Sequence, residues 1–390
     1  MKILITSELY APLINGVVTS IVTLRKVLID LGHDVRILTL GRETDESADR
    51  KIYYCSSITC DQIYPGARLI LKTDQAILAK IIDWEPDIIH SQSEFSTFRF
   101  AKKVAKYLDI PIVHTYHTNY EDYTHYFAPN YTIGRKITQI FSKFLSSSID
   151  TMIAPTQKIA ELLTGYDIKS DIEVIPTGIA LNKYINPCPE SELESLRKEL
   201  KIPKENKILL FVGRLAKEKN IEELINYLNR IKRKNISFLI VGDGPYRQEL
   251  ENLTSDKNME DQIIFTGMVE TSQIAQYYQL ADIFVNASTS ESQGLTYIEA
   301  MASGLTPLCR KDDSIKEVIY DSRNGFQYKN FQDFHSHLTK LLSSRDLRQR
   351  LGDQAQHFIL CKYSDQTFAR SIEQVYEKTL QQKLALKVTI

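Results

Sequence analysis

The stretch "KILLFVGRLAKEKNIEELINYLNRIKRKNISFLIVG", residues 207–242, decides the fold class of this chain. Two short apolar runs stand at its ends, and between them the apolar residues of 221–233 recur at helical spacing. Apolar strands that alternate with helices predict a parallel sheet that is covered by helices on both faces. The alternation continues, with strands predicted at 262–267, 282–288 and 305–309 and helices at 271–281 and 296–303.

The first part of the chain repeats this pattern. A strand at 2–7 precedes a helix at 16–32, whose end is marked by Gly32. The segment 177–206 holds three prolines and many charges, which favours a linker. We therefore predict an α/β fold of two doubly wound, Rossmann-like domains that face a central cleft. The other elements predicted in the first domain are strands at 33–40, 86–92, 110–116, 151–156 and 172–178 and a helix at 95–108.

The composition is that of an ordinary globular protein. Its 390 residues carry a net charge of −1, which gives no global electrostatic argument for binding nucleic acid. Five scattered cysteines form no C-x-x-C pair, which argues against a metal cluster or a disulfide framework and fits a reducing cytosol. The N-terminus reads as a strand and not as a signal peptide. No apolar run approaches the ~20 residues of a membrane span, so any contact with a membrane is expected to be peripheral.

Candidate functional residues follow the predicted strands, where ligands bind in open parallel sheets. Arg214 and Lys219 come after the strand at 207–213. Two cations at this place suit a diphosphate, and they would stabilise charge on a phosphate leaving group. The same residues also fit a solvated loop in which Glu218 is the local partner.

The stretch "SESQGLTYIEAMASG" follows the strand at 282–288, and a helix is predicted to begin near Leu295. Gly294 leaves room for a phosphate at this helix N-terminus, where Leu295 and Thr296 would supply backbone N–H donors. Glu291 is placed to reach a sugar hydroxyl, and Glu299 a ribose. Favourable interaction of acidic residues with the helix dipole is the alternative explanation of both glutamates.

Two further loops are candidates in the first domain. Asn15 and Gly16 precede another helix N-terminus, although Asn-Gly is also a common turn. His117 stands after the strand at 110–116 and could bond a substrate hydroxyl, or it could be an ordinary core or surface histidine. The sequence contains no G-x-G-x-x-G dinucleotide fingerprint and no H-E-x-x-H zinc motif. A D-x-D element is also missing, which fits diphosphate binding without a metal.

The helix predicted at 131–145 has an apolar stripe. Residues 99–143 hold seven Lys and Arg side chains and three Asp and Glu side chains, a local excess of positive charge. Such a helix with flanking cations could lie in a lipid interface. Packing of the stripe on the domain core is the alternative.

Together, these motifs resemble the retaining nucleotide-sugar glycosyltransferases of family four, which have the GT-B fold. Glu291 and Glu299 look like that family's paired-glutamate motif, and "GRLAKEKN" looks like its donor-phosphate motif. Gly16 is similar to its N-terminal glycine loop, although many members have two consecutive glycines where this chain has Asn15 and Gly16. His117 looks like its acceptor-side histidine, and the turn at 267–269 like its nucleobase-edge loop.

The resemblance implies roles for the parts of the chain. Residues 1–178 would form an acceptor-binding, membrane-facing domain, and residues 179–363 would form the nucleotide-sugar donor domain. A helix at about 364–390 would pack back on the first domain. The implied catalytic residues are His117, Arg214, Lys219 and Glu291. The implied donor-binding residues are Gly16, Arg214, Lys219, Val269, Glu291, Gly294, Leu295, Thr296 and Glu299.

"PLINGVVTSI" and "YHTNYEDYTHYF" are similar to the branch that glucosylates diacylglycerol, the 1,2-diacylglycerol 3-α-glucosyltransferases. This implies a retaining, metal-independent hexosyltransferase without a cofactor, moving α-glucose from UDP-glucose to the 3-hydroxyl of 1,2-diacylglycerol. It would act at the anionic cytoplasmic face of the cell membrane. Open alternatives are a hexosyl transfer to monoglucosyldiacylglycerol, a non-lipid acceptor, a phosphorylase and a non-enzymatic sugar-nucleotide sensor. The residues implied to face membrane and acceptor are Tyr120, Tyr123, Arg135, Lys136 and Lys143.

Overall fold

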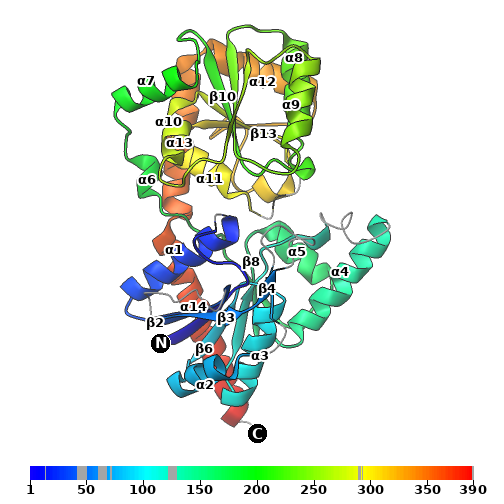
Figure 1. Cartoon of the computed structure of the whole chain (residues 1–390), viewed down its shortest axis with the longest axis vertical. Helices are drawn as coiled ribbons and strands as arrows, with labels where there is room; N and C mark the ends of the chain where they lie inside the picture. Colours follow the sequence, from blue (N-terminus) through cyan, green and yellow to red (C-terminus); the bar gives the residue numbers. More distant parts are fainter. Residues whose placement is uncertain are drawn as a thin grey trace. The chain divides into compact units, whose positions relative to one another are not determined.

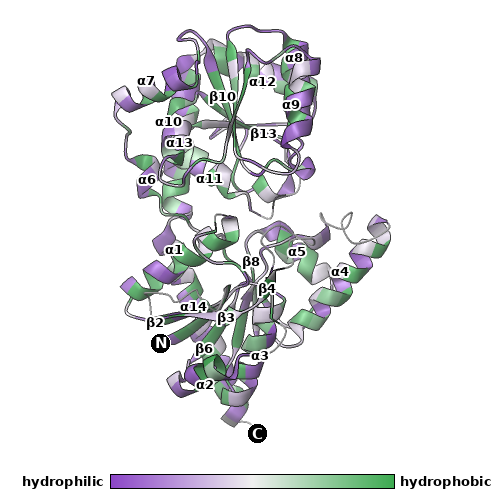
Figure 2. Ribbon diagram, in the orientation of Figure 1, coloured by the Kyte–Doolittle hydropathy of each residue, from purple (hydrophilic) through white to green (hydrophobic). Residues whose placement is uncertain are grey.

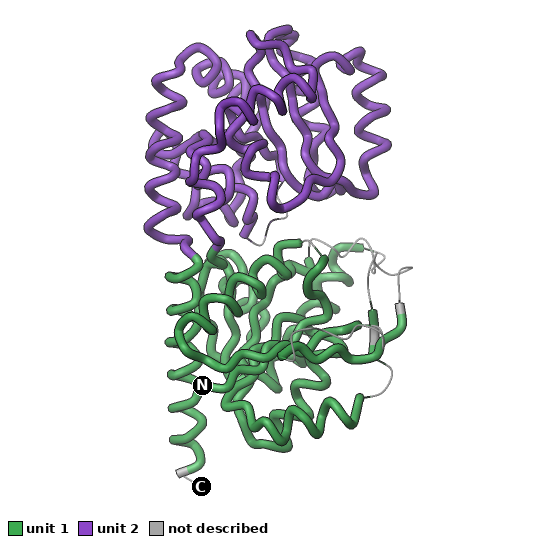
Figure 3. The backbone as a smooth tube through the Cα atoms, turned by 60° about the vertical axis from the view of Figure 1, so that its left-hand side comes forward, with its two compact units in different colours: residues 1–178, 365–390 green, residues 179–364 purple. Residues whose placement is uncertain are grey.

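The computed structural model describes residues 1–13, 15–41, 51–59, 68–70, 73–121, 130–288, 291 and 293–388. The chain divides into two compact units (Figure 3). Unit 1 comprises Met1–Gly178 and Asp365–Ile390, and unit 2 comprises Ile179–Ser364. Each unit has its own parallel sheet, which confirms the predicted α/β fold with two Rossmann-like domains.

Unit 1 is built on a seven-stranded parallel sheet of order β3-β2-β1-β6-β7-β8-β9 (Figure 1). The order reverses between β1 and β6, so the carboxyl ends of these two strands mark the place where such folds bind ligands. The strands are β1 Lys2–Thr6, β2 Asp34–Gly41, β3 Ile52–Ser56, β6 Ile88–Ser91, β7 Ile112–Thr115, β8 Thr151–Ala154 and β9 Asp171–Val174, and Ile58–Thr59 (β4) pairs with Arg68–Leu69 (β5). The helices are α1 Gly16–Asp30, α2 Gln75–Trp84, α3 Ser96–Leu108, α4 Tyr131–Ser146, α5 Gln157–Gly165 and α14 Asp365–Val388.

Unit 2 has a six-stranded parallel sheet of order β12-β11-β10-β13-β14-β15. Its order reverses between β10 and β13. The strands are β10 Lys207–Val212, β11 Ile236–Val241, β12 Ile263–Gly267, β13 Ile283–Asn286, β14 Thr306–Arg310 and β15 Phe326–Tyr328. The helices are α6 Asn182–Ile185, α7 Glu190–Glu199, α8 Ile221–Ile231, α9 Arg247–Asp256, α10 Ile274–Leu280, α11 Leu295–Ala302, α12 Phe331–Ser343 and α13 Arg345–Lys362, with 3-10 turns at Lys217–Lys219 and Asp313–Ile315.

Both faces of each sheet are buried, as the continuous apolar strands require. In β10, Leu209 and Phe211 pack on one face, whereas Ile208 and Leu210 pack on the other. The strands are accordingly among the most hydrophobic parts of the ribbon (Figure 2). Successive residues of a strand point to opposite faces, so an apolar run with no alternation fills two cores at once.

Helix α14 belongs to unit 1, although the whole of unit 2 lies between it and the rest of unit 1 in the sequence. Its Phe368, Ile372 and Tyr376 are buried in the core that also contains Leu24 of α1. The Tyr376 hydroxyl lies 2.6 Å from Nδ1 of His90 in β6. The two parts of unit 1 are therefore joined by packing and by a buried polar contact.

The segment 177–206 differs from the predicted linker. It forms α6 and α7, and its Ile179, Tyr184 and Leu196 are buried in the core of unit 2. Pro189 stands directly before α7, a position that proline tolerates because the first helical N–H groups have no partner in the helix. The prolines therefore lie at the ends of short helices.

Within the described residues, no helix is both long enough and apolar enough to cross a membrane.

Candidate functional site

The predicted donor residues lie at the carboxyl edge of the unit 2 sheet. Parallel pairing of β10 with β13 brings the loops that follow these strands to the same edge. Arg214 follows β10 and is half-buried, and the chain then turns through the 3-10 segment Lys217–Lys219. Glu291 follows β13.

Lys219 and Glu291 form an ion pair at this edge. The Lys219 Nζ donates to Glu291 Oε1 over 2.7 Å, and each side chain is only 15% exposed. Partial burial weakens screening by water, so this pair is held more firmly than one on an open surface. Lys219 thus has a partner 72 residues away in the sequence.

Gly294 is required where the loop turns into α11. Its φ is +72°, in the left-handed region that favours glycine. A Cβ atom there would lie 2.5 Å from Cδ2 of Tyr297, and the ring of Tyr297 is buried. Helix α11 begins at Leu295, as predicted, and Gly294 supplies no side-chain hydrogen bond to its first N–H groups. Such a helix N-terminus can receive an anion.

Glu299 lies in a different environment from Glu291. Its carboxylate accepts a hydrogen bond of 2.8 Å from the hydroxyl of Tyr278 in α10. Burial raises the pKa of Glu299, and hydrogen bonding and the nearby Lys183 only partly oppose this. The two predicted glutamates therefore differ in chemistry, since Glu291 is ion-paired and Glu299 accepts a hydrogen bond from a neutral tyrosine hydroxyl.

The remaining donor candidates are spread over both units. Val269 follows the carboxyl end of β12 and packs partly against the unit 2 core. Leu295 also touches this core, and Thr296 is half-buried beside it. In unit 1, Gly16 is the exposed first residue of α1. Asn15 Oδ1 accepts the Val18 N–H over 2.9 Å, so this helix N-terminus is capped by its own chain.

His117 lies at the corresponding edge of unit 1, after β7. Its Nε2 lies 2.6 Å from Oε1 of Gln92, the residue directly after β6. Burial lowers the pKa of His117 to about 4. The imidazole is consequently neutral near pH 7.

Helix α4 turns its large apolar side chains outward. Gly134, Thr138 and Ser142 are buried, whereas Ile140 and Phe144 are each 65% exposed. Core packing, the alternative considered above, applies to Leu145, whereas the half-buried Phe141 stacks on the exposed Phe95. Ile133 and Ile137 are also exposed.

The cations predicted to face a membrane are exposed on α4. Arg135 contacts Glu121 through Nε at 3.1 Å, and Lys143 contacts Asp167 at 3.2 Å. Lys136 is exposed. Tyr120 is half-buried, and its ring packs against Tyr116 and Phe141 beneath α4. Tyr123 lies outside the described residues.

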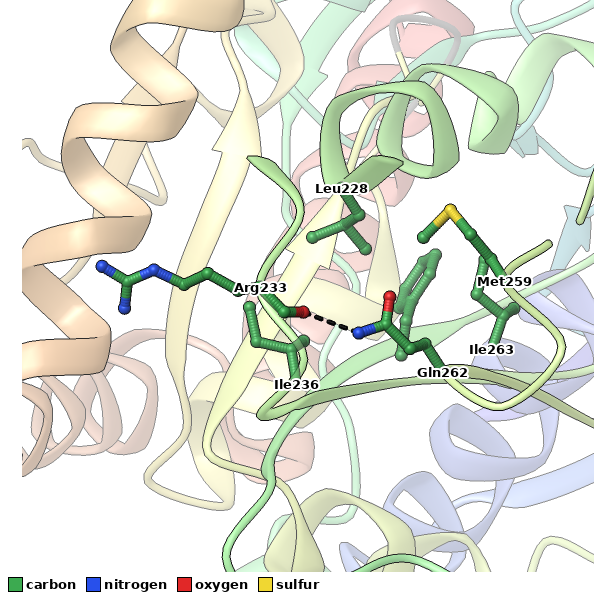
Figure 4. Close-up of a pocket in the computed structure, with 7 residues that line it drawn as sticks. Leu228, Arg233, Ile236, Met259, Gln262 and Ile263 are labelled. Carbon is green, nitrogen blue, oxygen red and sulfur yellow. Dashed lines mark hydrogen bonds between the residues drawn. The ribbon is translucent and has the colours of Figure 1, made fainter. Parts of the chain in front are cut away.

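Two other hollows lie away from these loops. A cavity of about 10 Å³ in unit 2 is lined by Leu228 and Met259, beside the hydrogen bond from the Gln262 amide to the Arg233 carbonyl (Figure 4). It has space for a single water at most. A groove of about 600 Å³ in unit 1 lies between α14 and the starts of β8 and β9. Neither is lined by a residue predicted for the site. In the part of the chain that the structure describes, no group of three or more His, Cys, Asp or Glu side chains is arranged to hold a metal ion.

The sequence analysis missed several residues of these sites. Gln92 had a usable signal, because it directly follows a predicted strand on the same edge as His117. Tyr278 and Lys183 had none, since their approach to Glu299 depends on how α10 and α6 pack on the unit 2 core.

The family models and the most similar relatives that match this chain all describe glycosyltransferases or glycolipid synthases. The family model described as Glycosyltransferase Family 4 matches residues 14–183, and that described as Glycosyl transferases group 1 matches residues 193–358. The chain is 33% identical to an alpha-monoglucosyldiacylglycerol synthase of Acholeplasma laidlawii, over 96% of each chain. It is 32% identical to the enzyme of the same name from Streptococcus pneumoniae, over 96% of this chain and 85% of the relative.

Solved structures share the fold. Anabaena Alr3699/HepE, crystallised with UDP and glucose, superposes with a TM-score of 0.77 at 17% identity, over 97% of this chain and 100% of that chain. A glycosyltransferase from Rickettsia africae gives a TM-score of 0.77 at 20% identity, over 97% and 98% of the two chains. At these identities the likeness concerns the fold alone.

Proposed function

The chain belongs to glycosyltransferase family 4, and from that premise we propose that it transfers α-glucose from UDP-glucose to the 3-hydroxyl of 1,2-diacylglycerol, with retention. The broader class, a nucleotide-sugar-dependent hexosyltransferase, follows from the family and the relatives. The specific donor and acceptor are suggested by the names of the two synthases and by the sequence motifs. The reaction would take place at the cytoplasmic face of the cell membrane.

The ion pair of Lys219 with Glu291 carries the donor side of the proposal. It holds a cation and a carboxylate together beside the N-terminus of α11 before any substrate arrives. In our proposal, Lys219 and Arg214 bind the diphosphate, and Glu291 binds a hydroxyl of the glucose. Such preorganisation favours catalysis, because the groups need no rearrangement when the leaving charge develops.

The other donor residues surround this pair in our proposal. Gly294 lets a phosphate approach the backbone, where the N–H groups of Leu295 and Thr296 would donate to it. Glu299 would bind the ribose and Val269 the edge of the uracil. Gly16 would contact the donor from unit 1. We propose that the diphosphate is bound without a metal ion.

The proposed chemistry needs no protein nucleophile. The bond between the anomeric carbon and the diphosphate breaks, and the acceptor oxygen bonds to that carbon on the same face. A phosphate oxygen of the leaving UDP takes the proton of the acceptor hydroxyl. Lys219 and Arg214 would stabilise the negative charge that the leaving group gains.

Helix α4 carries the acceptor side of the proposal. Diacylglycerol lies in a bilayer, so the enzyme must bind at the lipid surface. The exposed Ile140 and Phe144 would enter the interface, and Arg135, Lys136 and Lys143 would face anionic headgroups. Each such cation contributes about 1 kcal/mol near an anionic membrane.

The test uses the full chain and vesicles of phosphatidylglycerol that contain diacylglycerol. We expect UDP-glucose to give monoglucosyldiacylglycerol with an α-linkage, identified by mass and by NMR of the anomeric proton. Product formation from another nucleotide sugar only, or on a glycolipid but not on diacylglycerol, would refute the specific donor or acceptor. Binding of UDP-glucose without any turnover would refute the enzymatic assignment.

The membrane contact has a separate test. We expect Ile140→Ser/Phe144→Ser to bind these vesicles more weakly than the wild type in a flotation assay. A control, Leu384→Ser/Leu386→Ser, changes two equally exposed leucines on α14 and is expected to bind normally. Equal binding by all three proteins would contradict the role of α4.

A further inference from the structure

One partly buried hydrogen bond joins the loops after β6 and β7 and has no part in the reaction described so far. His117 Nε2 lies 2.6 Å from Oε1 of Gln92. Gln92 is only 3% exposed, and its backbone N–H donates to the Thr6 carbonyl over 2.8 Å at the end of β1. The backbone of Gln92 is therefore anchored to the sheet, and its buried side chain offers His117 an acceptor.

The chemistry of this contact determines where the imidazole hydrogen lies. An amide oxygen only accepts hydrogen bonds, so Nε2 of His117 must donate, and in a neutral ring Nδ1 then keeps its lone pair. We infer that Gln92 fixes the tautomer of His117, so that Nδ1 accepts a hydrogen bond from a hydroxyl group of the bound substrate. This inference rests on the proposed function for the identity of that hydroxyl, which belongs to the glucose or to the diacylglycerol. Gln92 is thus a positioning residue.

The surroundings of His117 keep it neutral. Burial is the largest influence on its pKa, and it outweighs the carboxylate of Glu94, which favours the charged ring. His114 in β7 also lowers the pKa of His117. His90 in β6 is occupied by contacts of 2.6 and 2.8 Å with the hydroxyl groups of Tyr376 and Thr115.

Access to the ring is compatible with a binding role. His117 is half-buried, whereas Gln92 and His114 are buried. The residue is therefore partly accessible to solvent while its Nε2 contacts Gln92. A neutral acceptor of this kind favours a hydroxyl group over an anion, because the lone pair of Nδ1 repels negative charge.

The tautomer can be measured without any substrate. ¹⁵N chemical shifts of the ring nitrogens, in the full chain labelled at its eight histidines, distinguish the two neutral forms. A His117→Gln variant assigns the signal. We expect the wild type to have its hydrogen on Nε2 near pH 7, and Gln92→Met to show a mixture of both forms. A wild-type His117 with its hydrogen on Nδ1 would overturn the inference, whatever the substrate proves to be.

The kinetic test compares two substitutions of Gln92. Gln92→Met removes the acceptor, and we expect kcat/KM to fall by about 3- to 10-fold, the effect of one neutral hydrogen bond. Gln92→Glu keeps an oxygen acceptor but adds a charge that stabilises the imidazolium. For Gln92→Glu we expect near-normal kcat/KM at high pH. The acid limb of the pH profile of kcat/KM should move to higher pH by about 1 to 3 units, because the added carboxylate raises the pKa of His117 and the imidazolium has no lone pair on Nδ1.

The control and the contrary outcomes are defined by the same assay. Gln366→Glu makes the same charge change at an exposed position in the first turn of α14 and is expected to leave the pH profile unchanged. The substrate whose KM rises in Gln92→Met is the one whose hydroxyl His117 binds. Equal losses in both Gln92 variants with no shift of the acid limb, or wild-type behaviour in both, would overturn the inference.

Discussion

The two sheets carry loops of different chemistry at edges that are topologically equivalent. Both have parallel strands and a reversal of strand order next to the first strand of the unit. At the edge of unit 2, the ion pair of Lys219 and Glu291 lies beside the start of α11, where the N-cap residue is Gly294, which has no side chain to cap the helix. At the edge of unit 1, Asn15 caps the helix and His117 is a neutral ring bound to a neutral amide. If the proposed function holds, one scaffold binds a charged diphosphate in unit 2 and uncharged hydroxyl groups in unit 1.

The largest expected effect comes from removing the cation at the charged edge. We expect Lys219→Ala to lower kcat by about 100-fold or more, because a leaving charge loses a preorganised partner. Transfer from radiolabelled UDP-glucose measures this. Lys217→Ala is a matched control, since Lys217 is exposed in the same 3-10 turn. Similar rates in the two variants would mean that Lys219 does not stabilise the leaving charge, and the charged edge of unit 2 would then have no special role.

His117 and Glu299 should also change the free energy of unfolding with pH in opposite directions. The native pKa of His117 is about 4, whereas an unfolded histidine titrates near 6.5. As the pH falls through this window, the unfolded chain takes up a proton that the native ring does not, so stability is lost by up to about 3 kcal/mol. Glu299 acts the other way, because its native pKa is raised, and its contribution is lost as the pH rises through that value.

Denaturant unfolding between pH 4.5 and 7.5 measures the difference. We expect His117→Gln to flatten the loss of unfolding free energy on the acid side. His90, whose pKa is also lowered by burial, keeps part of that loss in the variant. His357→Gln replaces an exposed ring on α13 and should reproduce the wild-type curve. An unchanged acid-side slope in His117→Gln would mean that the ring is not held neutral.

A smaller effect is expected at the glycine that opens α11. Gly294→Ala forces a left-handed residue to carry a Cβ against the ring of Tyr297, so we expect about 2 kcal/mol less stability. Gly165→Ala, in α5, meets nothing within 4 Å and should be neutral or slightly stabilising. Melting temperatures of both variants check this. Equal stability of the two would show that the loop relaxes without strain.

The smallest expected effect on stability comes from removing the Asn15 cap of α1. We expect Asn15→Ala to cost about 1 kcal/mol through the lost cap of α1. Asn330 caps α12 in the same way, through a bond of 3.1 Å to the Asp333 N–H, so Asn330→Ala should cost a similar amount. Only Asn15→Ala is expected to alter the KM for UDP-glucose, because Gly16 follows it. Identical KM values would assign Asn15 a purely structural role.

Local patterns predicted most of the described strands, because apolar runs such as 208–212 and 238–241 are unbroken. They missed β3 and β15 and about half of the described helices, among them α2, α5, α9, α12 and α13. The same patterns could not predict the contact of Lys219 with Glu291, since it depends on β10 pairing with β13 across the sheet. Composition also misled at 177–206, where prolines stand at the ends of short helices that pack on unit 2.

The orientation of α4 was beyond sequence reasoning for a further reason. Its periodicity defines an apolar stripe, but periodicity does not say whether that stripe faces the core or the solvent. The structure decides this through Gly134, Thr138 and Ser142, whose small side chains let the helix lie close to unit 1 by its other face. The paired glutamates illustrate the same limit, because their different surroundings come from distant tyrosines and a lysine.

The division of unit 1 between two stretches of sequence has a consequence for biosynthesis. During translation, residues 179–364 emerge as one continuous piece and can complete their core as soon as they leave the ribosome. The N-terminal piece is made first, yet its α1 face stays open until Phe368, Ile372 and Tyr376 of α14 arrive. Unit 1, which carries the exposed apolar side chains of α4, is therefore the last to complete its fold. A nascent chain stalled before residue 365 would expose both the uncovered face of α1 and the apolar side chains of α4 to the chaperones of the cell.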